Sequence, residues 1–426
     1  MDILQSEFQQ KSLTGEEISM TVVSWWNSIY AKKIQKQITE DRWSVLAAIV
    51  IERPSIPRSK GEVLAIGIGT QCVGKRRLDS AGHVLHDSHA EILAKRSFRR
   101  YLVLELERIK QGKHTDNDIL EWKTSTKKYG IKDGYRIHFY SSESPCGDAC
   151  IYPVCCKSIK CEIVTSEPPK KKVKRITGAK PLDNNNEIME EQQVNILRLK
   201  PGRTNIPDTE RTLSMSCSDK IAGWNVYGLQ GAILSMEIDP IYLSTVTVTH
   251  DELTTENDQK AALERSLCKR IQDFDMTRKE ISRSYHINSC SCNVVPRSFT
   301  EKYFKFKRST DQRPSPLCFN WCKELQSEVE TTVGIHGLRQ GSNIKAGPTK
   351  VTRSRLSNSA FTDSLFAAKI FSKLPFCELT YEKFKKQSKT YTELKSRFQD
   401  KCFRGWVLTP VMCKQWKVIS EKMESK

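Results

Sequence analysis

The first quarter of the chain combines one helical hydrophobic pattern with two strand-like runs. Residues 17–38 predict an amphipathic helix whose apolar positions fall near one face: Ile18, Val22, Trp25, Trp26, Ile29 and Tyr30. The run VLAAIVIE at 45–52 predicts a short strand, and EVLAIGIGTQC at 62–72 predicts a second one. The intervening RPSIPRSKG carries turn residues, so the two strands are expected to form a hairpin.

Strand and helix patterns continue to alternate up to residue 250. LHDSHAEILAKRSFRRYL at 85–102 begins a helical pattern that extends to residue 110. YRIHFYSSESPCGDAC at 135–150 predicts a strand that ends at a proline-cysteine corner. SCSDKIAGWNVYGLQGAILS at 216–235 predicts a capped helix, and IYLSTVTVTH at 241–250 a strand. This alternation predicts an α/β layer, followed by a mostly helical part whose clearest helix is 379–403.

Residues 157–210 interrupt this pattern. They are polar, contain prolines and lack periodicity, so we expect a largely disordered basic insertion in a single domain, 1–426, with its core at about 20–415. The run PPKKKVKR at 168–175 is similar to a nuclear localisation signal, which gives the nucleus, the cytoplasm or both as the expected location. A solvated loop that helps to hold RNA fits the same run.

The charge balance narrows the class of partner. Lysine and arginine number 69 against 50 aspartates and glutamates, a net charge of +19. A chain this basic usually meets a polyanion, and nucleic acid is the first candidate; a basic solvated surface without a partner is the alternative. No window of about 18 apolar residues occurs, so no membrane span is expected. The 15 cysteines are odd in number and irregularly spaced, as in a reducing compartment, with some available for metal.

His89 and Glu91 allow two interpretations. Asp87 or Ser88 could cap a helix, with Glu91 completing a capping box. Alternatively, H-x-E followed downstream by Pro145-Cys146 matches the signature of zinc nucleobase deaminases. There, one histidine and two cysteines hold Zn²⁺, and the glutamate moves the proton.

The second cysteine ligand stays open from spacing alone. The cysteine after Cys146 stands four positions on rather than three, so Cys150, Cys155, Cys156 and Cys217 are all candidates. Cys217 has a local argument, because it heads a predicted helix, where free N–H groups favour a thiolate. Cys290-x-Cys292 could indicate a second metal, but no paired cysteine or histidine motif stands nearby at finger spacing.

The segments DSHAEILAKRS, SPCGDA and SCSDKIAGWNVYGLQGAILS resemble the adenosine deaminases that act on RNA. More narrowly, the chain resembles the tRNA-specific members, which convert the adenosine 3′ of the anticodon to inosine. The resemblance covers the chain from about residue 20 to about 415, apart from 157–210. It implies a cytidine-deaminase-like α/β fold, a mixed sheet sandwiched by helices, and a tRNA substrate, with tRNA-Ala suspected.

The resemblance also assigns residues. It implies that His89, Cys146 and Cys217 bind zinc, that Glu91 is the proton shuttle, and that Val45 and Thr70 lie near the flipped base. Relatives carry a basic residue at the position of Cys150.

A second ligand is implied for the basic residues. Taken alone, the lysines and tyrosines of 381–395 and the pair Lys95–Arg96 fit a solvated helix face as well as a phosphate-lined pocket. The family buries inositol hexakisphosphate, and the matching positions are Lys95, Arg96, Lys220, Tyr381, Lys385, Tyr391, Lys395 and Trp406. Gly223 and Asn358 stand where relatives usually carry basic residues. In the family's arrangement, Asp87 and Lys220 link this pocket to the zinc site.

Three rival functions share these features: a double-stranded-RNA editing deaminase, a catalytically silent RNA-binding protein on the same fold, and a cytidine deaminase. Glu91 argues against a silent protein, and the motif set fits a cytidine deaminase less well. Duplex-editing relatives carry separate RNA-binding modules ahead of the catalytic domain. The core here begins within roughly the first 45 residues, so tRNA is the expected substrate; no DNA partner is expected.

Overall fold

The computed structural model describes twelve parts of the chain. They are residues 12–54, 60–154, 177–182, 193–202, 207, 210–276, 285–300, 312–323, 328–341, 350–352, 355 and 379–418. The predicted localisation run at 168–175, Cys155, Cys156 and Asn358 lie outside these residues.

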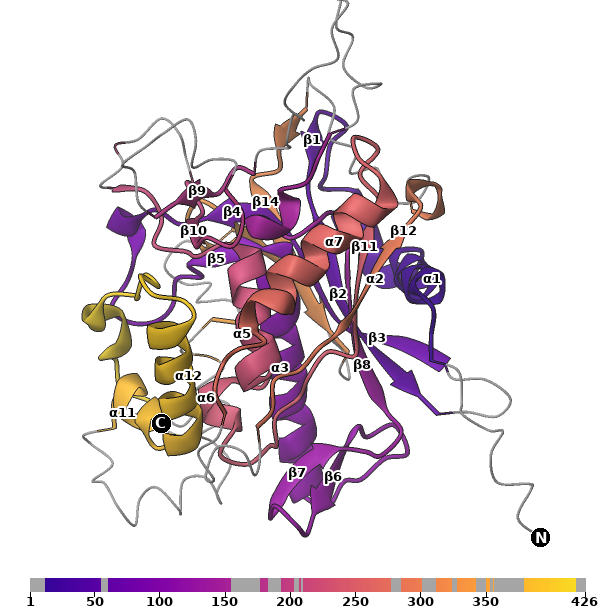
Figure 1. Cartoon of the computed structure of the whole chain (residues 1–426). Helices are drawn as coiled ribbons and strands as arrows, with labels where there is room; N and C mark the ends of the chain where they lie inside the picture. The colour runs from indigo at the N-terminus through magenta and orange to yellow at the C-terminus, as the bar shows by residue number, and fades with distance from the viewer. Residues whose placement is uncertain are drawn as a thin grey trace, which may run out of the picture.

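An eight-stranded mixed sheet forms the centre of the fold (Figure 1). Its strands, in spatial order, are β12 (Ser291–Val295), β11 (Thr245–Thr249), β8 (Arg136–Ser141), β2 (Leu46–Arg53), β3 (Lys60–Ile68), β14 (Leu317–Cys322), β15 (Glu330–Val333) and β16 (Leu338–Arg339). The strands β8, β11 and β12 run parallel, and every pair from β8 through β2 to β16 is antiparallel. The predicted β2–β3 hairpin and the α/β class are confirmed.

Helices cover both faces of the sheet, because successive side chains of its central strands are buried in two different hydrophobic cores. In β2, Ala47, Ile49 and Ile51 belong to the core shared with α3 (Ala90–Lys110) and α5 (Cys217–Tyr227). Their neighbours Leu46, Ala48 and Val50 belong to the core shared with α1 (Gly15–Trp26). Side chains of a strand point alternately to opposite faces, so a strand buried on both sides is apolar throughout. Figure 1 shows α3, α5 and α7 (Glu256–Leu267) together over one face of the sheet.

A close approach fixes α3 on the sheet. A Cβ atom at Gly67 of β3 would lie 2.2 Å from the carbonyl oxygen of Ala90 and 2.4 Å from the nitrogen of Ala94. Any side chain there would push α3 away. Glycine at this position therefore sets how closely the helix that begins next to His89 packs on the sheet.

The predicted helix at 17–38 is two helices. The first, α1, begins with a capping box between Thr14 and Glu17 and ends at Trp26. The second, α2 (Ile29–Gln35), starts after Ser28, so the hydrophobic face does not continue. Ile29 and Tyr30, expected on the buried face, are 72% and 42% exposed. The prediction is wrong at this point because the chain turns at 27–28.

The C-terminal part contains more strand than expected. After residue 250 the described residues contribute β12, β14, β15 and β16 to the sheet. The expected helix at 379–403 is present as α11 (Tyr381–Lys386) and α12 (Lys389–Lys401). The predicted helix at 216–235 is likewise divided into α5 and α6 (Gly231–Leu234). Short strands pair outside the main sheet: β1 (Arg42–Trp43) with β13 (Arg313–Pro314), β4 (Thr70–Cys72) with β5 (Asp87–His89), and β6 (Leu120–Lys123) with β7 (Lys128–Ile131).

The segment 157–210 is not wholly an appendage. Residues 155–176 and 183–192 lie outside the described residues, but β9 (Lys180–Pro181) pairs with β10 (Arg198–Leu199). Arg198 and Lys200 are 1% and 2% exposed. The expectation of disorder is therefore too broad for the C-terminal end of this segment, which packs into the fold.

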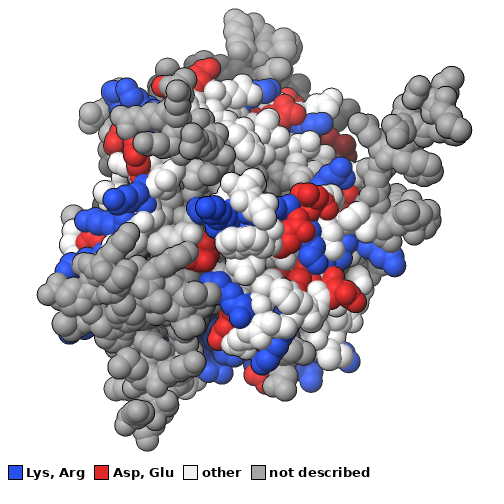
Figure 2. All heavy atoms as spheres, turned by 90° about the horizontal axis from the view of Figure 1, so that it is seen from below, with Lys and Arg blue, Asp and Glu red and all other residues white. Residues whose placement is uncertain are grey.

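Figure 2 shows the molecule from below, with lysines and arginines interspersed among aspartates and glutamates over the described surface. The charge of +19 is therefore not gathered into one field on the described part of this face. Within the part of the chain that the structure describes, no helix is both long and apolar enough to cross a membrane.

Candidate active site

Three side chains from distant parts of the sequence converge at the N-terminal end of α3. The Nδ1 atom of His89 lies 3.8 Å from the Sγ atom of Cys146 and 3.7 Å from that of Cys217. Their donor atoms all lie within 4.8 Å of one another, which suits ligands of a single ion. One imidazole and two thiolates are a donor set that zinc prefers in proteins. These residues therefore fit a metal, with a fourth position left for a non-protein ligand.

His89 and Cys217 lie where secondary-structure elements meet, and Cys146 lies in the loop between β8 and the turn at 148–150. His89 ends β5 and is the N-cap residue of α3. Cys217 is the first residue of α5, whose start is capped by the Ser216 side chain. The backbone N–H of Cys217 also donates to the Cys146 sulfur at 3.3 Å. A hydrogen bond from the Cys217 thiol holds the pKa of Cys146 well below its usual value, which favours the thiolate that a metal requires.

Gly147 allows Cys146 to approach α5. Its φ is 105°, and a Cβ atom would lie 2.3 Å from the Ser216 Oγ. Only glycine adopts this conformation readily and leaves room for the capping serine. The SPCGDA motif thus needs its glycine so that the two cysteine ligands can meet.

The described cysteine candidates differ in whether they lie near His89. Cys217, not Cys150, joins His89 and Cys146. The Cys150 thiol is buried and donates to the carbonyl oxygens of Ser144 and Pro145, at 3.2 and 3.3 Å. Cys150 thus offers no positive charge at this position, where the resemblance had implied a basic residue.

Glu91 is not part of a capping box. The N-cap residue is His89, and no side-chain hydrogen bond caps this end of α3. Glu91 is instead 3% exposed, and burial raises the pKa of its carboxyl group above the usual value. A buried carboxyl group whose pKa is raised is typical of a residue that exchanges protons in catalysis.

Thr70 and Val45, which the resemblance places near the flipped base, lie close to His89. Thr70 is paired with His89 across the β4–β5 ladder, and its buried hydroxyl has no hydrogen-bond partner among the described residues. The carbonyl oxygen of Val45 accepts from the N–H of Gly69, the residue before Thr70. Thr70 therefore offers a polar group to a ligand beside the candidate metal.

Asp87 connects the metal ligands to a set of cations. Its carboxylate accepts from the Lys200 Nζ at 2.8 and 3.0 Å and from the Lys220 Nζ. It also accepts from the backbone N–H of His89 at 3.1 Å and contacts the Cys72 thiol at 3.4 Å. Although burial opposes ionisation, the two lysines hold the pKa of Asp87 well below its usual value. Asp87 is therefore a buried carboxylate that orients the backbone of His89.

Lys200 is a residue beside the candidate metal site that the sequence did not reveal. It lies in the segment expected to be disordered, two residues beyond Arg198. The alternation of leucines in NILRLK is the one signal for a strand there, and it is too short to stand out. Its partner Asp87 is 113 positions away, so the ion pair is visible only in three dimensions.

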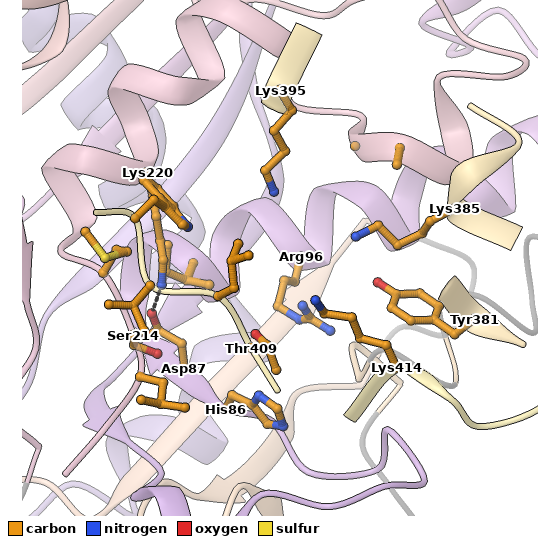
Figure 3. A pocket seen from close by; sticks show the side chains of 18 of the residues that line it. His86, Asp87, Arg96, Ser214, Lys220, Tyr381, Lys385, Lys395, Thr409 and Lys414 are labelled. Carbon is orange, nitrogen blue, oxygen red and sulfur yellow. Dashed lines mark hydrogen bonds and ion pairs between the residues drawn. The ribbon is translucent and has the colours of Figure 1, made fainter. Parts of the chain in front are cut away.

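A basic cavity of about 440 Å³ lies on the other side of Asp87 (Figure 3). All eight residues predicted to bind inositol hexakisphosphate line it: Lys95, Arg96, Lys220, Tyr381, Lys385, Tyr391, Lys395 and Trp406. Arg99, Lys386 and Lys414 also line it, and the sequence did not single them out for this pocket. Among the described residues, eight lysine or arginine side chains line the cavity together with the two carboxylates of Asp87 and Glu382.

Aromatic rings hold the lysines in place around this cavity. The Nζ atom of Lys95 lies 4.7 Å from the centre of the Trp224 ring, and that of Lys395 lies 5.6 Å from the Tyr227 ring. Burial, and then repulsion from Arg99, Lys395 and Arg96, hold the pKa of Lys95 well below its usual value. So many cations around one cavity would be costly without an anion.

A longer side chain at Gly223, which the resemblance led us to expect, would meet Tyr227. A Cβ atom there would lie 2.3 Å from the Tyr227 hydroxyl oxygen. The Tyr227 ring occupies the space into which a longer side chain would extend.

Comparisons with known proteins agree with this geometry. A family model described as the adenosine-deaminase (editase) domain matches residues 65–410. The tRNA-specific adenosine deaminase 1 of Drosophila melanogaster is 32% identical over 80% of this chain and 76% of its own length. The Mus musculus protein of that name is 25% identical over 95% of this chain and 100% of its length. The double-stranded RNA-specific adenosine deaminase of Mus musculus is 28% identical over 86% of this chain, but over 30% of its own length.

Fold, site and matches define an enzyme that deaminates adenosine. The chain belongs to the adenosine-deaminase (editase) domain family, as its sequence motifs predicted.

Proposed function

We propose that this protein catalyses zinc-dependent hydrolytic deamination of adenosine to inosine in tRNA. The observation that carries the proposal is the convergence of His89, Cys146 and Cys217 beside the buried carboxyl group of Glu91. Neither a structural cap nor a simple RNA-binding surface requires that combination.

Each residue of the site has a separate role in this reaction. Zn²⁺ at the three ligands would supply a hydroxide for attack on C6 of adenine at neutral pH. Glu91 accepts the proton of the water and delivers it to N1 of the base. It then assists the departure of ammonia. Thr70 and Val45 position the base, and Asp87 fixes the backbone N–H of His89. Adenosine and water give inosine and ammonia.

We infer that the basic cavity holds inositol hexakisphosphate. Six phosphates would neutralise the facing cations, which share the cavity with the described carboxylates of Asp87 and Glu382. The ligand would also reach Lys220, and through it Asp87, so that anion binding and the metal site share one chain of charges. The volume of about 440 Å³ lies in the range of about 300–1,000 Å³ usual for small-molecule sites.

Two observations favour tRNA over a long duplex. The similarity to tRNA-specific relatives extends over 80–95% of this chain and 76–100% of theirs. In addition, the buried thiol of Cys150 offers no charge to a phosphate. A base in a loop also costs less to flip than a stacked base in a duplex.

The direct test is to incubate the pure protein with bulk tRNA and map A-to-G changes in reverse transcripts. Changes at the adenosine 3′ of the anticodon support the proposal. C-to-T changes would indicate a cytidine deaminase. Changes in duplex RNA alone would indicate a duplex editase, and no change in any RNA would indicate a silent binding protein.

A further inference from the structure

A second cluster of metal-ligating side chains lies beneath α5, away from the candidate active site. Cys268, Cys290 and Cys292 bring their Sγ atoms within 4.8 Å of one another. The Cys268 and Cys290 sulfurs are 3.6 Å apart, close to the 3.7 and 3.8 Å of the His89 contacts in the active-site trio. The cluster thus has the spacing of ligands around one ion.

The fold brings these thiols together from two elements. Cys268 follows the last residue of α7, and Cys292 lies in β12, onto which α7 packs (Figure 1). Cys290 stands two positions before Cys292, so the two share one side of the extended chain. Sequence spacing alone did not indicate a site, because the third ligand lies 22 positions from Cys290.

The surroundings suit a metal thiolate. The Nδ2 group of Asn225 donates to the Cys290 sulfur at 3.5 Å, and its Oδ1 atom accepts from Asn288 at 2.9 Å, which fixes the orientation of the amide. An N–H group directed at a sulfur stabilises negative charge there and orients the ligand. The same nitrogen also donates to the carbonyl oxygen of Leu267 at 3.0 Å, next to Cys268.

The ligand number selects the kind of ion. The three cysteines are 3–5% exposed, and no fourth histidine, cysteine or carboxylate joins them among the described residues. Zn²⁺ usually takes four ligands, and the described residues supply three here. Soft thiolates favour Cu(I), zinc and iron–sulfur clusters, and of these Cu(I) accepts three-coordinate ligation.

We propose that Cys268, Cys290 and Cys292 form a second metal site that binds Cu(I) in three-coordinate thiolate ligation. Binding replaces thiol protons by the ion, and those protons pass to solvent. Asn225 lies on the same helix as the zinc ligand Cys217, so occupation of this site would also secure the helix that carries it.

The test is an anaerobic titration of zinc-loaded protein with Cu(I), in competition with a chromophoric Cu(I) chelator. The wild type is expected to take one equivalent of copper and to keep its zinc. Cys292→Ser and Cys290→Ser should each lose the copper and keep the zinc. Cys402→Ser is the matched control. Cys402 is more accessible than the three buried thiols of the cluster, so copper that binds exposed thiols nonspecifically would be lost in this variant.

A second readout guards against misfolded variants. Copper should raise the melting temperature of the wild type and of Cys402→Ser, but not that of Cys292→Ser, because a ligand stabilises only the state that binds it. Equal copper uptake by wild type and Cys292→Ser would overturn the proposal. Two zinc ions per chain, one of them lost in Cys292→Ser, would overturn the choice of ion.

Discussion

The Nζ atom of Lys200 lies 2.8 Å from the Oδ2 atom of Asp87, and both side chains are buried, at 2% and 7% exposure. The same carboxylate holds the backbone N–H of His89 and the ammonium group of Lys220. One ion pair therefore links a metal ligand, a segment expected to be disordered and the basic cavity.

Breaking the Lys200–Asp87 ion pair should lower the free energy of unfolding substantially. Lys200→Met leaves a buried carboxylate with one cation fewer, and the loss of one partner of a buried pair typically costs about 3–5 kcal/mol. Urea denaturation checks this value. Lys269→Met is the matched control, since it breaks the exposed pair with Glu264, for which about 0–1 kcal/mol is expected. Equal losses in the two variants would show that Lys200 is not integrated into the fold.

Zinc content tests the choice of ligands. The wild type should hold about one zinc per chain, the number a single catalytic site needs. Cys217→Ala should lose it, because that thiol is 3.7 Å from the His89 imidazole. Cys150→Ala should keep it, because that thiol donates to carbonyl oxygens instead. The reverse pattern in elemental analysis would refute the assignment.

The sequence predicted the parts of the site that lie in local motifs. His89, Glu91 and Cys146 stand in short segments with recognisable spacing, whereas the choice of Cys217 and the eight pocket residues follow from resemblance. Lys200 and the Cys268 cluster were not predictable, because each depends on a partner far along the chain. The break between α1 and α2 was missed for a different reason. The helical spacing of apolar residues continues past Asn27, although the first helix ends there.

Glu91 should be needed for turnover but not for the fold. Glu91→Gln keeps the size of the side chain and removes its ability to accept a proton. A general acid–base residue typically contributes about 10²–10⁴-fold, so the single-turnover rate should fall by that factor. Zinc content and melting temperature are the controls, and both should stay near those of the wild type. A rate close to wild type would exclude the proton-transfer role.

The basic cavity should contain inositol hexakisphosphate and should not tolerate an added negative charge. Protein purified from a eukaryotic host should release inositol hexakisphosphate on denaturation, which mass spectrometry detects. Lys385→Glu, which places a carboxylate among the cavity cations, should reduce folded yield. Lys401→Glu at the exposed end of α12 should change stability by no more than about 0.5 kcal/mol. Fully folded and active protein without the ligand would contradict the prediction.

The measurement that tests the central claim most directly is a competition at physiological salt between two RNAs. One is a tRNA with adenosine 3′ of its anticodon, and the other is a long perfect duplex, with Glu91→Gln as the inactive control. We predict that wild-type protein forms inosine faster in the tRNA, because a loop base costs less to flip and the duplex contact is salt-sensitive. Faster inosine formation in the duplex would contradict the tRNA assignment, and no inosine in either RNA would contradict the proposed reaction itself.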